Sequence, residues 1–262
     1  MTIGIAGCGR MGMGMARSLH RAGFPVRGFD IRPLDAPFMV DTVDAFGDGL
    51  EILFTVVRDA AETDALLFDD QALLSQAPAL THLVICSTLS PRYVADLRTR
   101  VAGEITLVDA PMSGAQVAAD AGSLTFMVGG ADADIAPLLP LLDAMGARTH
   151  RMGGLGAGMT AKVLNNLVAA SSVAATRTAL DWAAAHGLDR DRLLALMHDS
   201  SGQTWFGSGF DRIEFARDGY MPDNTIGILA KDVAAALDAA PAGVDRELAA
   251  VLIETIRALR PA

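Results

Sequence analysis

The apolar pattern of the first 30 residues describes a strand, a tight turn, a helix and a second strand. Thr2–Ala6 is a short apolar run that stops at glycines, which is typical of a buried strand. Arg10–Ala22 carries apolar residues at helical spacing and ends at Gly23, and Pro25–Asp30 is a second apolar run. This order predicts a βαβ unit.

The alternation of strand-like and helical patterns continues to about residue 150. Because strands that alternate with helices are joined by crossovers, the order predicts a mostly parallel sheet with helices on both faces. Further strands are expected at Leu50–Val57, His82–Cys86, Ile105–Asp109 and Leu124–Val128. The helices between and after them are expected at Ala60–Phe68, Arg92–Val101 and Ile135–Met145.

Beyond residue 150 the pattern becomes helical, beginning with a long helix from about Met159 to Ala185. We therefore predict an α/β fold: a Rossmann-like domain with a mostly parallel sheet over residues 1–156, then an all-α domain over residues 157–262 that opens with the long helix. The later helices are expected at Arg190–His198, Trp205–Phe215 and Ile226–Ala239, and from about Asp245 onward.

The charge of the chain excludes one class of partner. Acidic residues number 31 and basic residues 21, and no basic run occurs, so we expect no nucleic-acid partner. Apolar residues make up 51% and charged residues 20%, which is close to average globular usage and excludes a disordered chain.

The sequence indicates neither a membrane protein nor a secreted one. The apolar stretch Val163–Ala185 contains Arg177 and Asp181, which a membrane-spanning helix rarely tolerates. The N-terminus runs directly into the first strand without the pattern of a signal peptide. Cys8 and Cys86 are isolated, which favours a reducing compartment, and we expect a cytoplasmic protein.

The segment Gly7-Cys8-Gly9-Arg10-Met11-Gly12 follows the first predicted strand and opens the first helix. Gly7 permits the tight turn, Gly9 lets a pyrophosphate approach the backbone, and Gly12 lets the helix pack on the sheet. N–H groups at the helix N-terminus then bind the pyrophosphate. Such glycines also occur in plain tight turns, but this context predicts a dinucleotide site that includes Arg10 and Met11.

Asp30 ends the second strand, 18 positions after Gly12. A carboxylate there binds the ribose hydroxyls of NAD and repels the 2′-phosphate of NADP, unless the residue is only a solvated strand end. Arg32 lies two positions further on, where an arginine can accommodate that phosphate. The sequence therefore predicts NAD as the cofactor and leaves NADP possible.

Four segments, in one order along the chain, carry a resemblance to a known family. They are the glycine segment, Asp109-Ala110-Pro111-Met112-Ser113-Gly114, Gly156-Ala157-Gly158 with Lys162 and Asn165-Asn166, and Lys231-Asp232. In these segments the chain resembles the β-hydroxyacid dehydrogenase family, the 3-hydroxyisobutyrate dehydrogenase-like proteins with an NAD-binding domain of the 6-phosphogluconate dehydrogenase type. The resemblance implies a nicotinamide cofactor, a small carboxylate substrate oxidised at its β-hydroxyl, and a helical domain that supports dimers or tetramers.

Lys162 is the residue that the resemblance makes the general acid/base. It lies near the start of the long apolar helix, where the helix dipole does not favour a cation. Asn165 and Asn166 follow three and four positions later, so we expect three polar side chains on one face with buried partners. A lysine there can exchange a proton with a substrate hydroxyl, and the resemblance gives Asn166 a role in substrate binding. The alternative is a surface lysine that extends to water.

Ser113 and Gly114 follow the predicted strand Ile105–Asp109. A small hydroxyl beside exposed backbone N–H groups can bind a carboxylate, and the resemblance assigns both residues to the substrate carboxylate. The alternative is an ordinary serine turn after a strand. Ala115 departs from the family, which often has a second glycine there, and an alanine narrows the pocket or restricts the backbone.

Four further positions complete the expected cofactor site. Val57 and Arg58 end a predicted strand at the carboxyl edge of the sheet, where ligands gather, although the family often has Leu-Pro there. The resemblance places Thr88 beside the nicotinamide and Lys231 near cofactor and substrate. On the sequence alone, Lys231 is equally an exposed helix lysine. The histidines are scattered without metal-ligand spacing, so no metal is expected.

These residues predict hydride transfer between the nicotinamide and the β-hydroxyl carbon of a small 3-hydroxyacid, or the reverse reduction of a semialdehyde. Two rivals remain. An imine reductase shares the architecture but usually lacks this lysine. A non-catalytic NAD-binding protein is favoured by the short segment of about thirty residues after Lys231-Asp232. The expected partners are a small carboxylate substrate and further copies of the chain in a homodimer or homotetramer, with no membrane partner.

Overall fold

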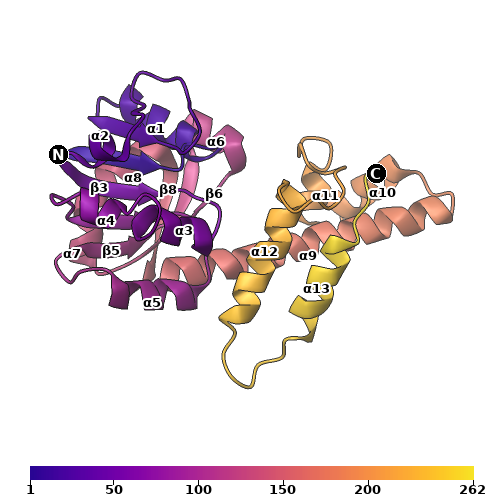
Figure 1. The fold of residues 1–262 in the computed structure, drawn as a ribbon. Helices are drawn as coiled ribbons and strands as arrows, with labels where there is room; N and C mark the ends of the chain where they lie inside the picture. Colours follow the sequence, from indigo (N-terminus) through magenta and orange to yellow (C-terminus); the bar gives the residue numbers. More distant parts are fainter. The chain divides into compact units, whose positions relative to one another are not determined.

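The computed structural model describes residues 1–262 as two compact units, Met1–Lys162 and Val163–Ala262 (Figure 1). The units divide within a long helix, α9 (Ala157–Ala185). The predicted domain boundary between residues 156 and 157 lies at the start of this helix and stays a prediction. No helix combines the length and the apolar character that crossing a membrane requires.

An eight-stranded sheet forms the centre of the first unit. The strands are β1 (Thr2–Ala6), β2 (Val26–Phe29), β3 (Leu50–Thr55), β4 (His82–Ile85), β5 (Thr106–Asp109), β6 (Met112–Ser113), β7 (Leu124–Gly129) and β8 (Gly146–Gly153). Their order is β2-β1-β3-β4-β5-β7-β6, and β8 pairs with β7. The neighbours from β2 to β5 are parallel, whereas β7 is antiparallel to β5 and β6. The mostly parallel sheet is confirmed.

Alternate side chains of the central strands enter two separate cores, as the period of two in a strand requires. Ile52 and Phe54 of β3 lie in one core, and Leu53 between them lies in the other. Helices α1 (Gly12–Arg21) and α8 (Leu139–Met145) supply the first core, and α3 (Ala60–Leu67) and α5 (Pro91–Arg100) supply the second. Because both faces are covered, the central strands β1, β3, β4 and β7 consist mostly of buried residues.

Short helices complete the first unit. They are α2 (Val43–Gly47), α4 (Leu73–Gln76), α6 (Ala115–Ala121), α7 (Asp132–Ile135) and a 3-10 turn (Ala136–Leu138). The predicted helix Ile135–Met145 is therefore broken into a 3-10 turn and α8, since Pro137 and Pro140 each remove a helical donor. Strand β3 ends at Thr55, so Val57 and Arg58 lie in the loop after it and not in the strand itself.

The second unit is helical, as predicted. Its helices are α9, α10 (Arg190–His198), α11 (Trp205–Gly209), α12 (Thr225–Asp238) and α13 (Glu247–Arg257). Figure 1 shows α12 and α13 side by side. The predicted helix Trp205–Phe215 stops at Gly209, yet Phe210 and Phe215 still pack in the core of this unit.

Candidate active site

The glycine segment joins β1 to α1 through a turn that only glycines can make. Gly7 has a φ of +90°, and a Cβ there would lie 2.6 Å from the carbonyl oxygen of Val56. A Cβ on Gly12 would lie 2.1 Å from the carbonyl oxygen of Gly7. The first and third glycines are therefore required by the packing of the strand, the turn and the helix.

Gly9 differs from its two neighbours in the motif. A Cβ on Gly9 would meet only Arg32 Nη2, at an ordinary contact distance of 3.6 Å. The protein itself therefore does not require a bare backbone at this position, whereas a ligand that approaches the backbone closely does. No side chain caps the N-terminus of α1, so the backbone N–H groups at this helix end are available to an anionic ligand.

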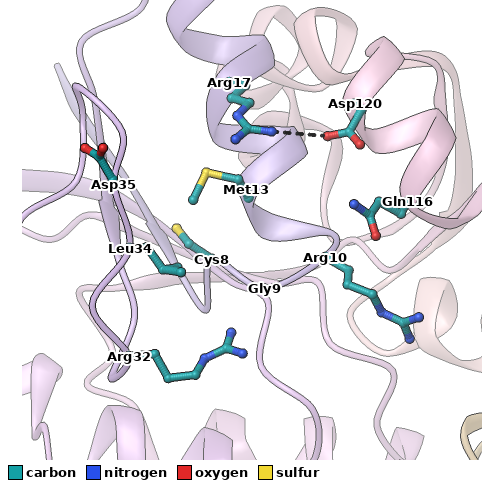
Figure 2. A pocket seen from close by; sticks show the side chains of 10 residues that line it. All are labelled: Cys8, Gly9, Arg10, Met13, Arg17, Arg32, Leu34, Asp35, Gln116 and Asp120. Atoms are coloured by element: carbon teal, nitrogen blue, oxygen red, sulfur yellow. Dashed lines mark ion pairs between the residues drawn. The ribbon is translucent and has the colours of Figure 1, made fainter. Parts of the chain in front are cut away.

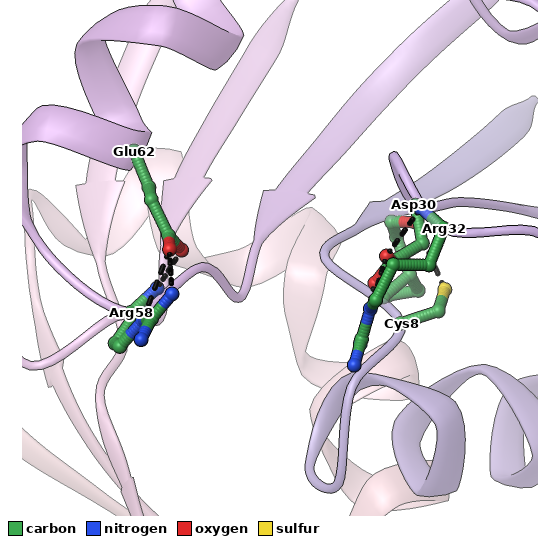
Figure 3. A network of polar contacts seen from close by, with 6 residues as sticks. Cys8, Asp30, Arg32, Arg58 and Glu62 are labelled. Atoms are coloured by element: carbon green, nitrogen blue, oxygen red, sulfur yellow. Dashed lines mark hydrogen bonds and ion pairs between the residues drawn. The ribbon is translucent and has the colours of Figure 1, made fainter. Parts of the chain in front are cut away.

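Asp30 lies directly after β2 and interacts with Arg32 (Figure 3). Arg32 Nε donates to Asp30 Oδ1 at 3.0 Å and Nη2 donates to Oδ2 at 3.3 Å, while the Asp30 side chain is only 7% exposed. The hydrogen bonds with Asp30 raise the pKa of Arg32. Burial, with a smaller contribution from Asp30, raises the pKa of Cys8 in the glycine segment to about 12. Asp30 and Arg32 together thus present one anion and one cation beside the glycine turn.

A cavity of about 370 Å³ opens beside this turn (Figure 2). Cys8 and Gly9 form part of its wall, and Arg10, Arg17 and Arg32 contribute three guanidinium groups. Figure 2 shows Arg10 and Arg32 on either side of Gly9, and Arg17 paired with an aspartate of α6. Asp35 and Asp120 also line the cavity, so three guanidinium groups face two carboxylates. Because the cations outnumber the anions and the backbone of Gly9 is bare, the cavity suits a ligand that carries phosphate.

The loops after β3 and β4 contain the other expected cofactor residues. Val57 is half-buried, and the exposed Arg58 donates through Nη2 to Glu62 Oε1 at 2.6 Å (Figure 3). Thr88 follows β4 and is half-buried. Ser90 accepts a hydrogen bond from the backbone N–H of Arg92 and caps α5, so capping does not require Thr88.

The segment from β5 to α6 forms the expected carboxylate loop. Ser113 ends β6 and is half-buried, and Gly114 and Ala115 are exposed. Gly114 has a φ of +137° and Ala115 a φ of +55°, so both are in conformations that favour glycine. Ala115 therefore has a backbone conformation that glycine adopts more readily than alanine does.

Lys162 is buried, with 8% of its surface exposed, and lies in the second turn of α9. The start of this helix is held by Asp109, the last residue of β5. The backbone N–H of Gly156 donates to Asp109 Oδ1 at 2.7 Å, and that of Met159 donates to Oδ2 at 2.5 Å. Lys162 thus follows directly on a helix start that is anchored to the sheet.

A second buried cluster lies within Val163–Ala262. The Asn166 side chain is buried, and its Nδ2 donates to Asp232 Oδ2 at 2.6 Å. Asp232 is 1% exposed, and its Oδ1 lies 3.1 Å from Lys231 Nζ. Asp232 therefore joins two of the predicted site residues, Asn166 and Lys231. Asn165 is itself exposed, but its Nδ2 donates to the buried Asn166 Oδ1 at 3.1 Å, so the expected buried partner is present.

Two residues of these clusters were not identified from the sequence as site residues. Asp109 and Asp232 are both fully or almost fully buried, which is unusual for aspartate unless it is paired. The sequence did carry an indication of this burial, since each aspartate directly adjoins an apolar run in a segment that carries the family resemblance.

The fold and the glycine turn define a dinucleotide-binding protein of the Rossmann type. Residues 2–154 match the family described as the NAD binding domain of 6-phosphogluconate dehydrogenase. Residues 156–262 match the family described as NAD-binding of NADP-dependent 3-hydroxyisobutyrate dehydrogenase.

Individual relatives extend over most of the chain. An L-threonate dehydrogenase of Escherichia coli is 30% identical over 92% of this chain and 82% of its own length. A 3-hydroxyisobutyrate dehydrogenase of Pseudomonas aeruginosa is 33% identical over 78% of this chain and 71% of its own. The crystal structure of a 3-hydroxyisobutyrate dehydrogenase from Salmonella typhimurium has a TM-score of 0.81 at 26% identity, and covers 98% of this chain and 93% of that one.

The chain belongs to the β-hydroxyacid dehydrogenase family, the NAD(P)-dependent oxidoreductases that act on hydroxyacids. The predicted family, the Rossmann-like fold followed by a helical part, the nicotinamide cofactor and the class of reaction are confirmed. The roles of the individual site residues stay predictions.

Proposed function

We propose that this chain oxidises the β-hydroxyl of a small 3-hydroxyacid, with Lys162 as the general acid/base. The chemistry that a bound NAD(P) would supply is acceptance of the hydride from the hydroxyl carbon. The neutral amine of Lys162 takes the hydroxyl proton, so that the C–O bond becomes a carbonyl and the lysine becomes an ammonium group. In the reverse direction the ammonium group returns the proton while a semialdehyde is reduced.

The observation that carries this proposal is the burial of Lys162. Only 8% of the surface of Lys162 is exposed, and the residue lies near the N-terminus of α9. Burial of a lysine and the positive end of a helix dipole are each, in general, unfavourable to an ammonium group. A group that cycles between amine and ammonium needs such an environment, whereas a lysine that only improves solubility does not.

The basic residues of the chain support the same assignment. Of its 21 lysines and arginines only Lys162 and Lys231 are lysines, and both lie in the segments that carry the family resemblance. A guanidinium group does not give up its proton in proteins, whereas an amine does. The chain therefore uses arginine elsewhere and has an amine at these two positions.

Ser113, Gly114 and Asn166 are proposed to bind the substrate, the first two through its carboxylate. Gly7, Gly9, Arg10, Met11, Gly12 and Asp30 are proposed to bind the dinucleotide, with Val57, Arg58, Thr88 and Lys231 completing its site. Because Asp30 repels a 2′-phosphate, NAD is the proposed cofactor. The bare backbone of Gly9 beside the arginine-lined cavity supports the location of this site.

The experiment compares Lys162→Ala and Lys162→Arg with the wild type on L-threonate and 3-hydroxyisobutyrate, following NADH absorbance. We expect kcat to fall about 10²- to 10⁴-fold in both variants, because arginine keeps the charge but cannot accept the proton. NADH binding, measured by fluorescence titration, should change less than about threefold. Turnover within about tenfold of the wild type in Lys162→Arg would show that only the charge matters.

The panel also separates this proposal from its rivals. A cyclic imine, offered with NADPH and NADH, tests the imine reductase, and NADH binding without turnover of any substrate would favour a non-catalytic protein. We further propose a cytoplasmic homodimer or homotetramer. The cytoplasmic location is supported by two free, buried cysteines, and the assembly by the exposed apolar side chains of α9.

A further inference from the structure

The proton carrier and the carboxylate loop share one anchor in the first unit. Asp109 is fully buried at the end of β5, and its two carboxylate oxygens accept hydrogen bonds from the backbone at the start of α9. Lys162 lies three residues after Met159, one of the two donors. Ser113 lies four residues after Asp109 in the same segment.

Two positions that contact the Asp109 carboxylate, residues 129 and 158, have room only for glycine. A Cβ on Gly129, which pairs with Asp109 in the sheet, would lie 2.3 Å from Asp109 Oδ1. A Cβ on Gly158 would lie 2.9 Å from Oδ2 and 2.3 Å from the carbonyl oxygen of Met127. Two glycines therefore let the backbone of α9 approach the carboxylate closely enough for both hydrogen bonds.

The charge of Asp109 is balanced between two opposing effects. Burial raises its pKa to about 6, and the hydrogen bonds donated by the backbone of Gly156, Met159 and Gly158 oppose this rise. The nearby thiol of Cys86 has a pKa raised by its burial and by Asp109, so the thiol is neutral. Two of the hydrogen bonds that stabilise this carboxylate thus come from the backbone at the start of α9.

We propose that Asp109 is a positioning residue that fixes the first turns of α9, and with them Lys162, to the strand that leads into the Ser113 loop. This inference rests on the proposed role of Lys162. Asp109 touches neither substrate nor cofactor. It acts by holding the amine at a constant place while the amine takes up and releases its proton.

Asp109→Asn tests the proposal. The side-chain amide places an N–H₂ group opposite one of the two backbone donors, so one hydrogen bond is replaced by a repulsive contact while the side-chain size is kept. We expect kcat on L-threonate or 3-hydroxyisobutyrate to fall about 10- to 100-fold, because a small displacement of a reacting group has an effect of that size. KM for the acid should change less than about threefold, and so should the Kd for NADH.

Two measurements report on the helix without turnover. Amide hydrogen exchange should become faster at residues 156–162 and stay unchanged in α5. Reductive methylation with ¹³C-formaldehyde labels the two lysines and the N-terminus, and we expect the NMR signal of Lys162 to shift in Asp109→Asn while that of Lys231 does not. Asp143→Asn, which removes an exposed carboxylate of α8, is the matched control and should leave all readouts unchanged.

Gly158→Ala is a second variant that keeps the charge of Asp109. Intrinsic helix propensity alone predicts that this change stabilises α9, whereas the contacts of Gly158 predict that it displaces the first turn. We expect it to reproduce the fall in kcat and the faster exchange at residues 156–162.

The outcomes separate this inference from the proposed function. If Lys162→Ala abolishes turnover while folded Asp109→Asn keeps kcat within about twofold of the wild type, the positioning role is wrong and the role of Lys162 stands. If Asp109→Asn loses NADH binding, or exchanges faster throughout the sheet, Asp109 is only a structural residue and the inference also fails. If Lys162→Ala keeps its turnover, the proposed function fails whatever Asp109 does.

Discussion

Arg32 forms an ion pair with Asp30 and so controls how strongly the Asp30 carboxylate acts on a bound ligand. Arg32 holds both carboxylate oxygens and lies on the wall of the cavity beside Gly9. In this position it partly neutralises the anion that disfavours a 2′-phosphate, and it is also a cation that such a phosphate can bind.

Arg32→Ala should therefore sharpen the preference for NAD. We expect the ratio of kcat/KM with NAD to kcat/KM with NADP to rise by about tenfold or more, since one charge-assisted hydrogen bond contributes about 1.5–3 kcal/mol. Steady-state kinetics with both cofactors measures the ratio. Arg148→Ala removes an exposed arginine of β8 and should leave the ratio unchanged. A fall in the ratio for Arg32→Ala would contradict the assignment of Asp30 and Arg32.

At this scale the sequence predicted the glycine turn and the position of Asp30 directly after β2, because their spacing reflects a mechanical need of the βα unit. It did not predict the roles of Asp109 and Asp232. An aspartate beside an apolar run is typical of a solvated end, and only the fold shows that backbone N–H groups and Asn166 surround these carboxylates. The exposure of Asn165 could not be predicted, because helical spacing alone does not define which side of α9 is covered.

Among the elements, α6 begins in an unfavourable conformation. Ala115 has a φ of +55°, which costs an L-residue about 1–2 kcal/mol relative to the right-handed helical region. Glycine lacks this penalty, but it also gains more freedom in the unfolded chain. The net gain in folding free energy on replacing Ala115 by glycine is therefore smaller than the strain energy alone.

Ala115→Gly should raise the free energy of unfolding by about 0.5–1 kcal/mol, measured by urea denaturation. Ala118→Gly, in the same helix at ordinary helical angles, is the matched control and should lower it by about 1 kcal/mol. Equal destabilisation by both substitutions would show that Ala115 is not strained.

Elements with a strong apolar period were predicted closely. β1 and α10 have the predicted bounds, and the other predicted strands differ by one or two residues. The elements that were missed are short or polar. β8 is exposed along most of its length and has no alternating apolar face, and α2 and α4 each have only four or five residues. Their conformation depends on tertiary packing, which the spacing of apolar residues along the sequence does not reveal.

For the molecule as a whole, α9 is apolar on two sides. Val173 and Ala174 lie in the core of the second unit. On the other side Leu164, Val168 and Trp182 are exposed, and their spacing of four and fourteen residues places them on one stripe. A long helix with a second apolar stripe suits burial against another copy of the chain.

Val168→Asp should therefore disrupt the assembly. Light scattering should give the wild type a mass of two or four times 27.3 kDa, and the variant a mass nearer to one chain. Val117→Asp is a matched control, because Val117 is 71% exposed and Val168 is 70% exposed. A wild type that runs as a single chain at micromolar concentration would contradict the proposed homodimer or homotetramer.

The buried thiol of Cys8 has a consequence for the enzyme under oxidative stress. Because burial raises its pKa to about 12, the thiol stays protonated at pH 7, and peroxides and alkylating agents react with the ionised form. The most reactive type of side chain in the nucleotide turn is thus chemically inert. Dinucleotide binding should consequently persist at peroxide levels that inactivate dehydrogenases with an accessible thiolate.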